Sequence, residues 1–333
     1  MLVTGGLGFI GSELVRRAAV RGEHVTNVDA ATYAGDPRRL AAVQPGCLDT
    51  ITMDVADPGL GDVVEEVRPD VLVHLAAETH VTRSEVEPDV FYRTNVEGTR
   101  VVLDAAVRAG VGVVVHVSTD EVYGSCDGAP FKEDEKQPGE GAASSAYARS
   151  KALADDLAQS YFGRAPVVVV RPTNCFGPWQ HPEKAIPRWI ARALSGEPLP
   201  VWGDGRQLRD WMAVEDLCEA VELLIERRVT GEVFNVAPEG SQRTNVEVAR
   251  AVARAAGRPA ESVYLTAYDR PAHDRRYAID ASKLRAMGWA PTAAFDERLA
   301  ATVEWYRRNR EWWEPLIDDA ETLYRDEKAR VEP

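Results

Sequence analysis

The glycine-rich segment at residues 4–11, TGGLGFIG, constrains the fold of this chain more than any other feature. Gly5, Gly8 and Gly11 stand between a short apolar run at Leu2–Thr4 and a helical pattern at 12–21. In a strand–turn–helix unit such glycines let the backbone approach a pyrophosphate at the positive end of the helix. Asp29 ends the next apolar run, about 20 residues further on, where a carboxylate accepts hydrogen bonds from ribose hydroxyls and repels a 2′-phosphate. The segment therefore predicts a dinucleotide site that takes NAD rather than NADP.

Short apolar runs alternate with helical patterns through the first half of the chain. The runs at 71–76, 113–118 and 167–171 are continuously apolar, as in strands buried on both faces, and helices are predicted at 98–109 and 147–163 between them. This alternation predicts an α/β fold with a Rossmann-type doubly wound parallel sheet, and we assign residues 1–173 to an NAD-binding domain. A helix at 214–227 and a strand at 233–236 predict that a segment of about 207–236 returns to it. Residues 174–206 and 237–333 are expected to form a smaller, C-terminal substrate-binding domain.

The composition limits the kinds of partner that the protein can bind and the cell compartment in which we expect it. The chain has 39 Lys and Arg against 53 Asp and Glu, a net charge of −14, which would repel nucleic acid. Its 4 cysteines are far apart and its 6 histidines show no ligand spacing, so we expect neither a disulfide framework nor a metal. No apolar run approaches the roughly 18–20 residues of a membrane span, and the N-terminus does not resemble a signal peptide. A cytoplasmic protein with no membrane partner is expected.

A tyrosine and a lysine at helical spacing are candidate catalytic residues. Tyr147 and Lys151 are four residues apart, so their side chains lie on one helix face. A nearby ammonium and a nicotinamide positive charge would lower the tyrosine pKa, so that its phenolate can take a proton from a sugar hydroxyl while hydride leaves for NAD. The spacing alone also fits an ordinary surface pair.

Two adjacent carboxylates follow the predicted strand at 113–118. The segment at 117–124 reads VSTDEVYG, which puts Asp120 and Glu121 at the carboxyl end of a buried strand, where open α/β sheets bind their ligands. If both are buried, one can stay protonated while the other ionises, giving an acid and a base side by side. Such a pair suits the elimination of water, although an ordinary charged loop would give the same sequence pattern.

These motifs and several others together resemble the dTDP-glucose 4,6-dehydratases, members of the extended short-chain dehydrogenase/reductase superfamily. The Asp–Glu pair is the most specific part, because related epimerases and decarboxylases share the glycine and YxxxK motifs and generally lack it. The resemblance spans almost the whole chain. It is carried by TGGLGFIG, TYAG (32–35), HLAAETHVTRS (74–84), STDEVYG (118–124), YARSK (147–151), NCFGPWQHPEKAIP (174–187), PLPVWGDGRQLRDW (198–211), HDRRYAID (273–280) and WYRRNREWWEPL (305–316).

The resemblance implies a role for each catalytic candidate. Thr119 and Tyr147 would contact the glucose 4-hydroxyl, Tyr147 taking its proton as the C4 hydride passes to NAD. Lys151 would hold the nicotinamide ribose. Glu121 would then remove the C5 hydrogen, and protonated Asp120 would donate to the 6-hydroxyl as water leaves. Hydride returns to C6, so NAD is retained and the product is a nucleotide-linked 4-keto-6-deoxyglucose.

Further contacts are expected in both halves of the site. Asp54, after a short strand at 51–53, suits the adenine, and the other expected cofactor contacts are Phe9, Ile10, Val55, Leu75, Ala76, Ala77 and Thr94. By resemblance, Asn174 reaches the sugar or phosphate, Lys184 belongs to the matching PEK segment, Arg209 and Arg275 suit the diphosphate, and Trp202 stacks on the base. The remaining expected substrate contacts are Thr79, Pro200, Asn235 and His273.

Some residues depart from the family pattern and leave the substrate open. The family commonly has Asp where Thr82 stands, Asn where Cys175 stands and Tyr where Phe176 stands, and Trp202 replaces its usual aromatic residue. The substrate is therefore expected to be dTDP-glucose or a related nucleotide-diphosphate hexose. A 4-epimerase or decarboxylase of the same fold and a non-catalytic NAD-binding protein are the alternative functions. The resemblance also implies a homodimer, which apolar faces of the helices at 98–109 and 147–163 could form.

Overall fold

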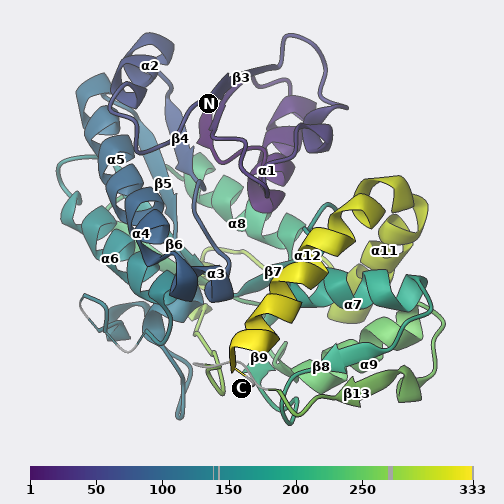
Figure 1. Cartoon of the computed structure of the whole chain (residues 1–333). Coiled ribbons are helices and arrows are strands. Elements are labelled where there is room, and N and C mark those ends of the chain that lie inside the picture. The colour runs from purple at the N-terminus through teal and green to yellow at the C-terminus, as the bar shows by residue number, and fades with distance from the viewer. Residues whose placement is uncertain (138, 142, 269–272, 332–333) are drawn as a thin grey trace.

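A seven-stranded parallel sheet forms the centre of the molecule (Figure 1). The computed structural model describes residues 1–137, 139–141, 143–268 and 273–331. The predicted Rossmann-type doubly wound sheet is confirmed, with strand order β11-β6-β5-β4-β1-β2-β3. The strands are β1 (Leu2–Thr4), β2 (Val25–Asp29), β3 (Leu48–Thr52), β4 (Val71–His74), β5 (Val113–Val117), β6 (Val167–Pro172) and β11 (Glu232–Val236).

Helices cover both faces of this sheet, which is why its central strands read as unbroken apolar runs. On one face lie α2 (Leu60–Val67), α5 (Gly98–Ala109) and α6 (Ala146–Ser160), and on the other α1 (Phe9–Val20) and α8 (Val214–Glu226) (Figure 1). β11 pairs in parallel with β6, so the chain returns to the sheet after leaving it. The edge strand β3 begins three residues before the predicted strand at 51–53, because its sequence LDTIT has only two apolar residues and no regular alternation.

Short elements connect the strands and helices around this sheet. α3 and α4 lie between β4 and α5, and η3 follows the end of β5. Their bounds are η1 (Pro37–Leu40), α3 (Val81–Val86), α4 (Pro88–Phe91), η2 (Tyr92–Glu97), η3 (Asp120–Tyr123), η4 (Glu133–Glu135) and η5 (Ala260–Ser262).

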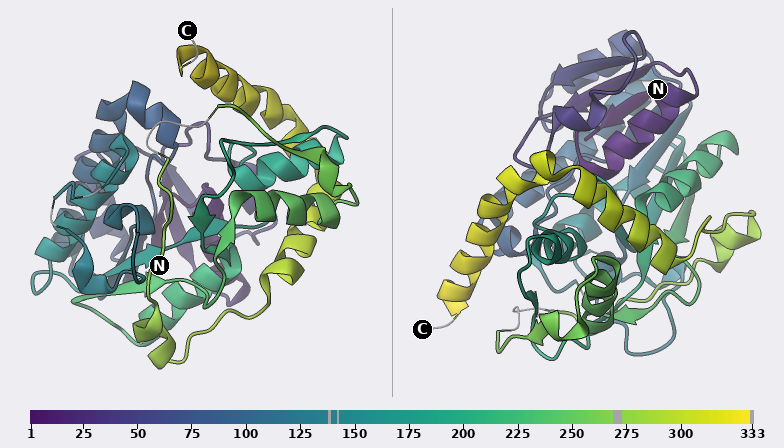
Figure 2. Two further views of the ribbon diagram at one scale, coloured as in Figure 1. Left: turned by 90° about the horizontal axis from the view of Figure 1, so that it is seen from below. Right: turned by 90° about the vertical axis from the view of Figure 1, so that its right-hand side faces the viewer.

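A second apolar cluster lies beyond the carboxyl ends of the strands and includes Trp189, Val252, Leu299, Tyr306 and Trp313. Three small sheets accompany it, in which β7 pairs with β10, β8 with β13 and β9 with β12. The two views of Figure 2 show α11 and α12 on the outside of this part, with the end of α12 far from the N-terminus. Its elements are β7 (Asn174–Phe176), α7 (Ala185–Leu194), β8 (Leu199–Val201), β9 (Leu208–Arg209), β10 (Trp211–Ala213), β12 (Arg243–Thr244), α9 (Asn245–Ala255), β13 (Val263–Leu265), α10 (Ser282–Ala286), α11 (Phe295–Arg308) and α12 (Arg310–Val331).

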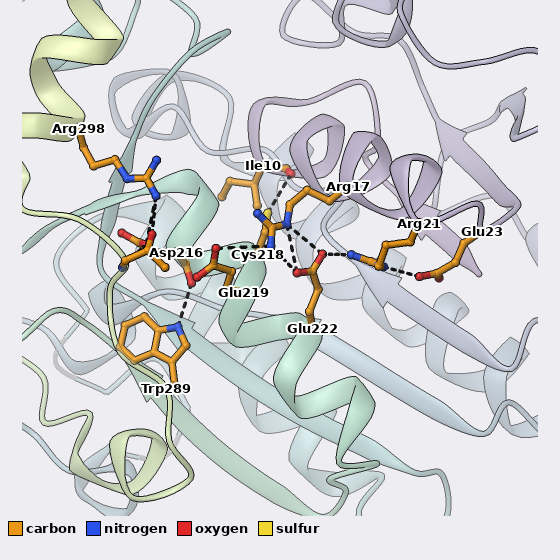
Figure 3. Close-up of polar contacts among 11 residues, drawn as sticks. Ile10, Arg17, Arg21, Glu23, Asp216, Cys218, Glu219, Glu222, Trp289 and Arg298 are labelled. Atoms are coloured by element: carbon orange, nitrogen blue, oxygen red, sulfur yellow. Dashed lines mark hydrogen bonds and ion pairs between the residues drawn. The ribbon is translucent and has the colours of Figure 1, made fainter.

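Polar contacts hold α1, the helix that follows the glycine turn, against α8 (Figure 3). The guanidinium of Arg17 donates to both carboxylate oxygens of Glu222, from Nε to Oε1 at 3.0 Å and from Nη2 to Oε2 at 2.7 Å. Arg21 also pairs with Glu222 and with Glu23. These contacts hold the C-terminal end of α1 against α8.

No helix in the described part of the chain has the length and apolar character that a bilayer crossing requires.

Candidate functional site

The turn between β1 and α1 has the backbone geometry that its glycines predict. Gly5 has φ +76°, and a Cβ there would lie 2.6 Å from the backbone nitrogen of Ala76. A Cβ on Gly11 would lie 2.2 Å from the carbonyl oxygen of Gly5. Helix α1 begins after Gly8 with no side-chain cap and no acidic residue in its first turn. Its free N–H groups and the positive end of its dipole can therefore receive an anion.

Asp29 lies at the carboxyl end of β2, next to this turn. Its Oδ2 accepts a hydrogen bond from the backbone N–H of Leu7 at 2.9 Å, and its Oδ1 accepts one from Ala31 at 2.8 Å. Each carboxylate oxygen keeps a second lone pair. Asp29 thus stabilises the turn itself and can still accept from ribose hydroxyls.

A cavity of about 280 Å³ runs from the glycine turn to the carboxyl ends of β5 and β6. We call it the first cavity. Its glycine wall, helix terminus and buried lysine fit a dinucleotide with an anionic pyrophosphate. Of the predicted cofactor and catalytic residues, its wall contains Gly5, Gly8, Phe9, Ile10, Gly11, Leu75, Ala77, Thr119, Asp120, Glu121, Tyr147 and Lys151.

Five predicted cofactor contacts do not line the first cavity. The carboxylate of Asp54 accepts from the N–H of Ala56 at 2.8 Å and pairs with Arg93. Val55 is buried in the apolar core under α2 and α5. Asp54 is thus held by its own loop and Val55 packs inward, and their contacts to the cofactor stay a prediction. The five residues outside the wall are Asp29, Asp54, Val55, Ala76 and Thr94.

Tyr147 and Lys151 are buried, so they do not form a surface pair. Ser145 caps α6 by accepting from the N–H of Ala148 at 3.0 Å, which starts the helix so that both side chains face the first cavity. The Nζ of Lys151 donates to the carbonyl oxygen of Val117 at 2.8 Å, and burial lowers its pKa to about 8.

The predicted lowering of the Tyr147 pKa is not a property of the protein alone. Burial, and then the charge of Glu121, raise this pKa well above its ordinary value. The ammonium of Lys151 is directed to a main-chain carbonyl while two carboxylates flank the phenol, so the predicted lowering of this pKa depends on the positive charge that the nicotinamide would add.

Thr119, Asp120 and Glu121 stand where β5 ends. Thr119 caps η3, its Oγ1 accepting from the N–H of Glu121 at 3.3 Å. Asp120 is 2% exposed, and its Oδ2 has no hydrogen-bond partner among the described residues. Burial, followed by the charge of Glu121, raises the pKa of Asp120 to about 7. At neutral pH Asp120 is therefore protonated in about half of the molecules, far more than an ordinary aspartate, so it can serve as a general acid.

A second cavity, of about 220 Å³, adjoins the first. Both cavities are lined by Thr79, Glu121, Asn174, Glu183 and Lys184, so Glu121 stands at their junction. Seven of the predicted substrate contacts line the second cavity: Thr79, Asn174, Lys184, Pro200, Trp202, Arg209 and His273.

Two predicted substrate contacts lie outside the wall of the second cavity. Asn235 is fully buried on β11, where its Oδ1 accepts from the hydroxyl of Tyr123 and its Nδ2 donates to the carbonyl oxygens of Phe131 and Asp280. Its amide is used within the fold. Arg275 is exposed and pairs with Asp204 at 2.9 Å, outside the wall of the second cavity.

Some lining residues were not singled out from the sequence. Glu183 and Tyr277 line the second cavity and belong to the PEK and HDRRYAID segments, so a residue-by-residue reading of those segments could have found them. Arg39 lines the first cavity, and no motif pointed to it. Arg209 stacks on Tyr277, with its Cζ 3.9 Å from the ring centroid.

The residues that depart from the family pattern have different surroundings. Cys175 lines the first cavity, and burial raises the pKa of its thiol, so it is not a reactive thiolate. Thr82 lines the second cavity. Phe176 is buried against Phe295, with ring centroids 5.3 Å apart, which makes it a packing residue.

The comparisons with known proteins agree with this site. Residues 1–237 match the model of the NAD dependent epimerase/dehydratase family. The chain is 42% identical to a dTDP-glucose 4,6-dehydratase of Xanthomonas campestris pv. campestris, covering 97% of each chain.

Solved structures give the same result. DesIV, the dTDP-glucose 4,6-dehydratase from Streptomyces venezuelae with NAD bound, is 41% identical with a TM-score of 0.87, covering 95% of this chain and 99% of its own. A UDP-glucose 4-epimerase of Thermus thermophilus is 30% identical with a TM-score of 0.83, covering 92% of this chain and 99% of its own. The chain therefore belongs to the NAD dependent epimerase/dehydratase family, and within it to the dTDP-glucose 4,6-dehydratases.

Proposed function

We propose that this protein is an NAD-dependent lyase that converts dTDP-glucose, or a related nucleotide-diphosphate hexose, to the 4-keto-6-deoxy sugar. The observation that carries this function is the Asp120–Glu121 pair, with Asp120 in the wall of the first cavity and Glu121 at the junction of the two. One of these carboxyls is buried with a pKa of about 7, and both lie beside Tyr147. A 4-epimerase has no use for an acid and a base at C5 and C6.

The glycine turn and α1 would hold the pyrophosphate of NAD, and Lys151 would hold its nicotinamide ribose. When bound, NAD supplies the site that accepts the C4 hydride and later returns it to C6. Tyr147 takes the proton of the 4-hydroxyl, with Thr119 as the second contact to that oxygen. Because the pKa of Tyr147 is high in the protein alone, even with Lys151 one helical turn away, the positive charge of the oxidised cofactor is needed to favour its phenolate.

Water is then eliminated across C5 and C6. The C4 ketone makes the C5 hydrogen acidic, and ionised Glu121 takes that proton. Protonated Asp120 gives its proton to the 6-hydroxyl, so the C6–O bond breaks and water leaves. The near-neutral pKa of Asp120 supports this division of roles, because an acid must hold its proton at the pH where the neighbouring base is ionised.

The second cavity would bind the rest of the substrate. Arg209 is suited to the diphosphate because its planar guanidinium matches phosphate oxygens. Hydrogen bonds to the main-chain carbonyls of Leu208 and Asp274 hold this guanidinium in position. Lys184 and Asn174 lie nearer the sugar end, which the two cavities share. Trp202 would stack on the base. We assign residues 1–173 with about 207–236 to cofactor binding, and residues 174–206 and 237–333 to substrate binding.

We also propose a cytoplasmic homodimer. Val86 on α3, Val90 on α4 and Val107 on α5 are exposed apolar side chains on helices that pack around α6, which supports an interface there. All 4 cysteines are free thiols, as a reducing compartment favours. Light scattering should give twice the mass of one chain, and a monomer at every concentration would contradict the dimer.

The function can be tested with purified protein and a panel of dTDP-, UDP- and GDP-glucose. We expect one nucleotide sugar to lose the mass of one water and to give the alkaline absorbance of a 4-keto sugar, without added NAD being consumed. Tyr147→Phe should slow the first oxidation. A product of unchanged mass with inverted C4 would instead identify an epimerase, and no product from any sugar would contradict a catalytic role.

A further inference from the structure

Next to Glu121, Tyr277 in the wall of the second cavity belongs to a series of hydrogen-bonded hydroxyl and carboxyl groups from three separate segments. The Tyr277 hydroxyl donates to Oδ2 of Asp274 at 2.6 Å, and Ser144, just before α6, donates to the same oxygen. The Oη of Tyr277 is also 3.4 Å from Oε2 of Glu121. Tyr277 is 4% exposed, and the guanidinium of Arg209 covers its ring.

The positions of the protons determine which of these groups donates a hydrogen bond and which accepts one. Tyr277 has one hydroxyl proton, and the short bond to Asp274 uses it. The side of Oη that faces Glu121 then presents lone pairs, which repel an ionised carboxylate and accept a hydrogen bond from a protonated one. Ser144 strengthens this arrangement, since its own proton goes to Asp274 and stabilises the carboxylate that holds Tyr277 in place.

We infer that Tyr277 and Asp274 are positioning residues that stabilise the protonated form of Glu121. The inference rests on the proposed function. When Glu121 takes the C5 proton, its new O–H donates to Oη of Tyr277, and no proton passes on to the tyrosine. Tyr277 and Asp274 thereby make Glu121 a stronger base at C5, and they hold the proton at Glu121 until it returns to C5.

Other charged and titratable groups also face Glu121, and a test must leave them unchanged. Asp120 is on its own element, Tyr147 approaches from α6, and Arg209 approaches from β9. The second cavity also contains Glu183, Lys184, Arg188 and His273. Tyr277→Phe removes only the hydroxyl and keeps the ring under Arg209, so that these groups keep their charges.

The test is the pH dependence of kcat and kcat/KM for the preferred nucleotide sugar in wild type, Tyr277→Phe and Asp274→Asn. One lost hydrogen bond should lower the acid-side pKa of the rate profile by about one pH unit and reduce kcat about five- to tenfold. Asp274→Asn should move the profile the same way, because the tyrosine proton is then less firmly held and can turn toward ionised Glu121.

Tyr161→Phe is the matched control, since Tyr161 donates to Asp104 at the same distance of 2.6 Å away from both cavities. It should leave the profile unmoved. If Tyr277→Phe and Asp274→Asn change only KM while the acid limb stays in place, the inference is wrong and the pair serves only to bind substrate. If wild type converts no nucleotide sugar, the proposed function has failed instead. Should Tyr277→Phe not fold, as judged by circular dichroism, Asp274→Asn and Ser144→Ala decide the question.

Discussion

At the scale of the single residue, Asp120 is the side chain whose surroundings most alter its chemistry. It lies just after a strand buried on both faces, and folding removes its carboxyl from water. The neutral form costs less to bury than the charged form, and the neighbouring charge of Glu121 adds to that preference. Adjacent residues of nearly the same chemistry thus acquire different roles, because Asp120 is buried and Glu121 borders both cavities.

We expect Asp120→Asn and Glu121→Gln to separate oxidation from elimination. Both variants keep Tyr147 and Lys151, so hydride should still leave C4, while formation of the 6-deoxy product falls by about 10²- to 10⁴-fold. Rapid-mixing absorbance of NADH and mass spectrometry of the product would measure the two steps separately. Full-rate formation of the 4-keto-6-deoxy sugar by both variants would show that the assigned roles are wrong.

Activity and stability should both depend on Asp120 near neutral pH. The elimination needs its protonated form, so turnover should fall as the pH rises through about 7. In an unfolded chain its pKa is about 3.9, so between about pH 4 and 7 the folded protein binds the extra proton and loses stability as the pH rises. The side chain of Asn in Asp120→Asn cannot titrate. Between pH 5 and 8 the free energy of unfolding of this variant should therefore fall by about 2–4 kcal/mol less than that of wild type. Urea unfolding at the two pH values would measure this, and equal losses would contradict it.

At the scale of the element, α6 is held in place by a fully buried ion pair one turn beyond Lys151. Arg171 on β6 donates to Asp155 from Nη2 at 2.7 Å and from Nε at 2.9 Å. Burial opposes the charge on Asp155, but the hydrogen bonds from Arg171 outweigh it and hold the pKa of Asp155 below its ordinary value. The pair therefore stabilises the fold at pH values above the ordinary pKa of an aspartate. This stabilisation is lost as the pH falls through the lowered pKa of Asp155.

Asp155→Asn should lower the free energy of unfolding by about 3–5 kcal/mol, because it leaves the Arg171 charge buried without its partner. Asp70→Asn is the matched control, since Asp70 and Arg228 make a similar two-bond pair at 2.8 and 3.0 Å on the exposed surface. That change should cost less than about 1 kcal/mol. Chemical denaturation of both variants gives the comparison, and equal losses would contradict the buried pair's role.

At the scale of the whole molecule, Arg39 connects segments that are distant in the sequence. Its Nη1 donates to the carbonyl oxygen of Leu7 in the glycine turn at 2.6 Å and to that of Ala34. Its Nε donates to the carbonyl oxygen of Trp179 at 3.0 Å, and the guanidinium lies over the ring of Trp312 on α12. Burial lowers the Arg39 pKa to about 10, so it remains charged at neutral pH.

Arg39→Gln should lower the free energy of unfolding by about 3 kcal/mol, because several hydrogen bonds to a charged group are lost. It should also reduce the NAD that copurifies with the protein, since Arg39 lines the first cavity. Arg38→Gln is the control, because Arg38 is exposed and pairs only with Asp36 among the contacts described. Thermal unfolding and NAD content after heat release measure the two effects. If Arg39→Gln had the same unfolding temperature and the same NAD content as Arg38→Gln, the contacts of Arg39 would contribute neither to stability nor to NAD binding.

Much of the fold could be predicted because its signals are local. The apolar runs and helical spacings predicted β1, β2, β5, β6, α5 and α8 to within a residue or two, and the glycine turn predicted the first cavity's wall. The sequence by itself also determined which side chains could act as base, acid and proton acceptor, because Glu121, Asp120 and Tyr147 belong to motifs of adjacent residues.

Only the tertiary structure decided what those side chains meet. Asn235 lies in the fold interior and Arg275 on the surface, and no motif distinguishes an inward from an outward direction in such segments. The pKa values of Asp120 and Tyr147 depend on burial and on neighbours from other elements, which spacing cannot express. Arg39 and Tyr277 gain their partners from segments far away in the chain. Contacts through space arise only when the sheet is assembled, so the sequence could name the candidates but not their surroundings.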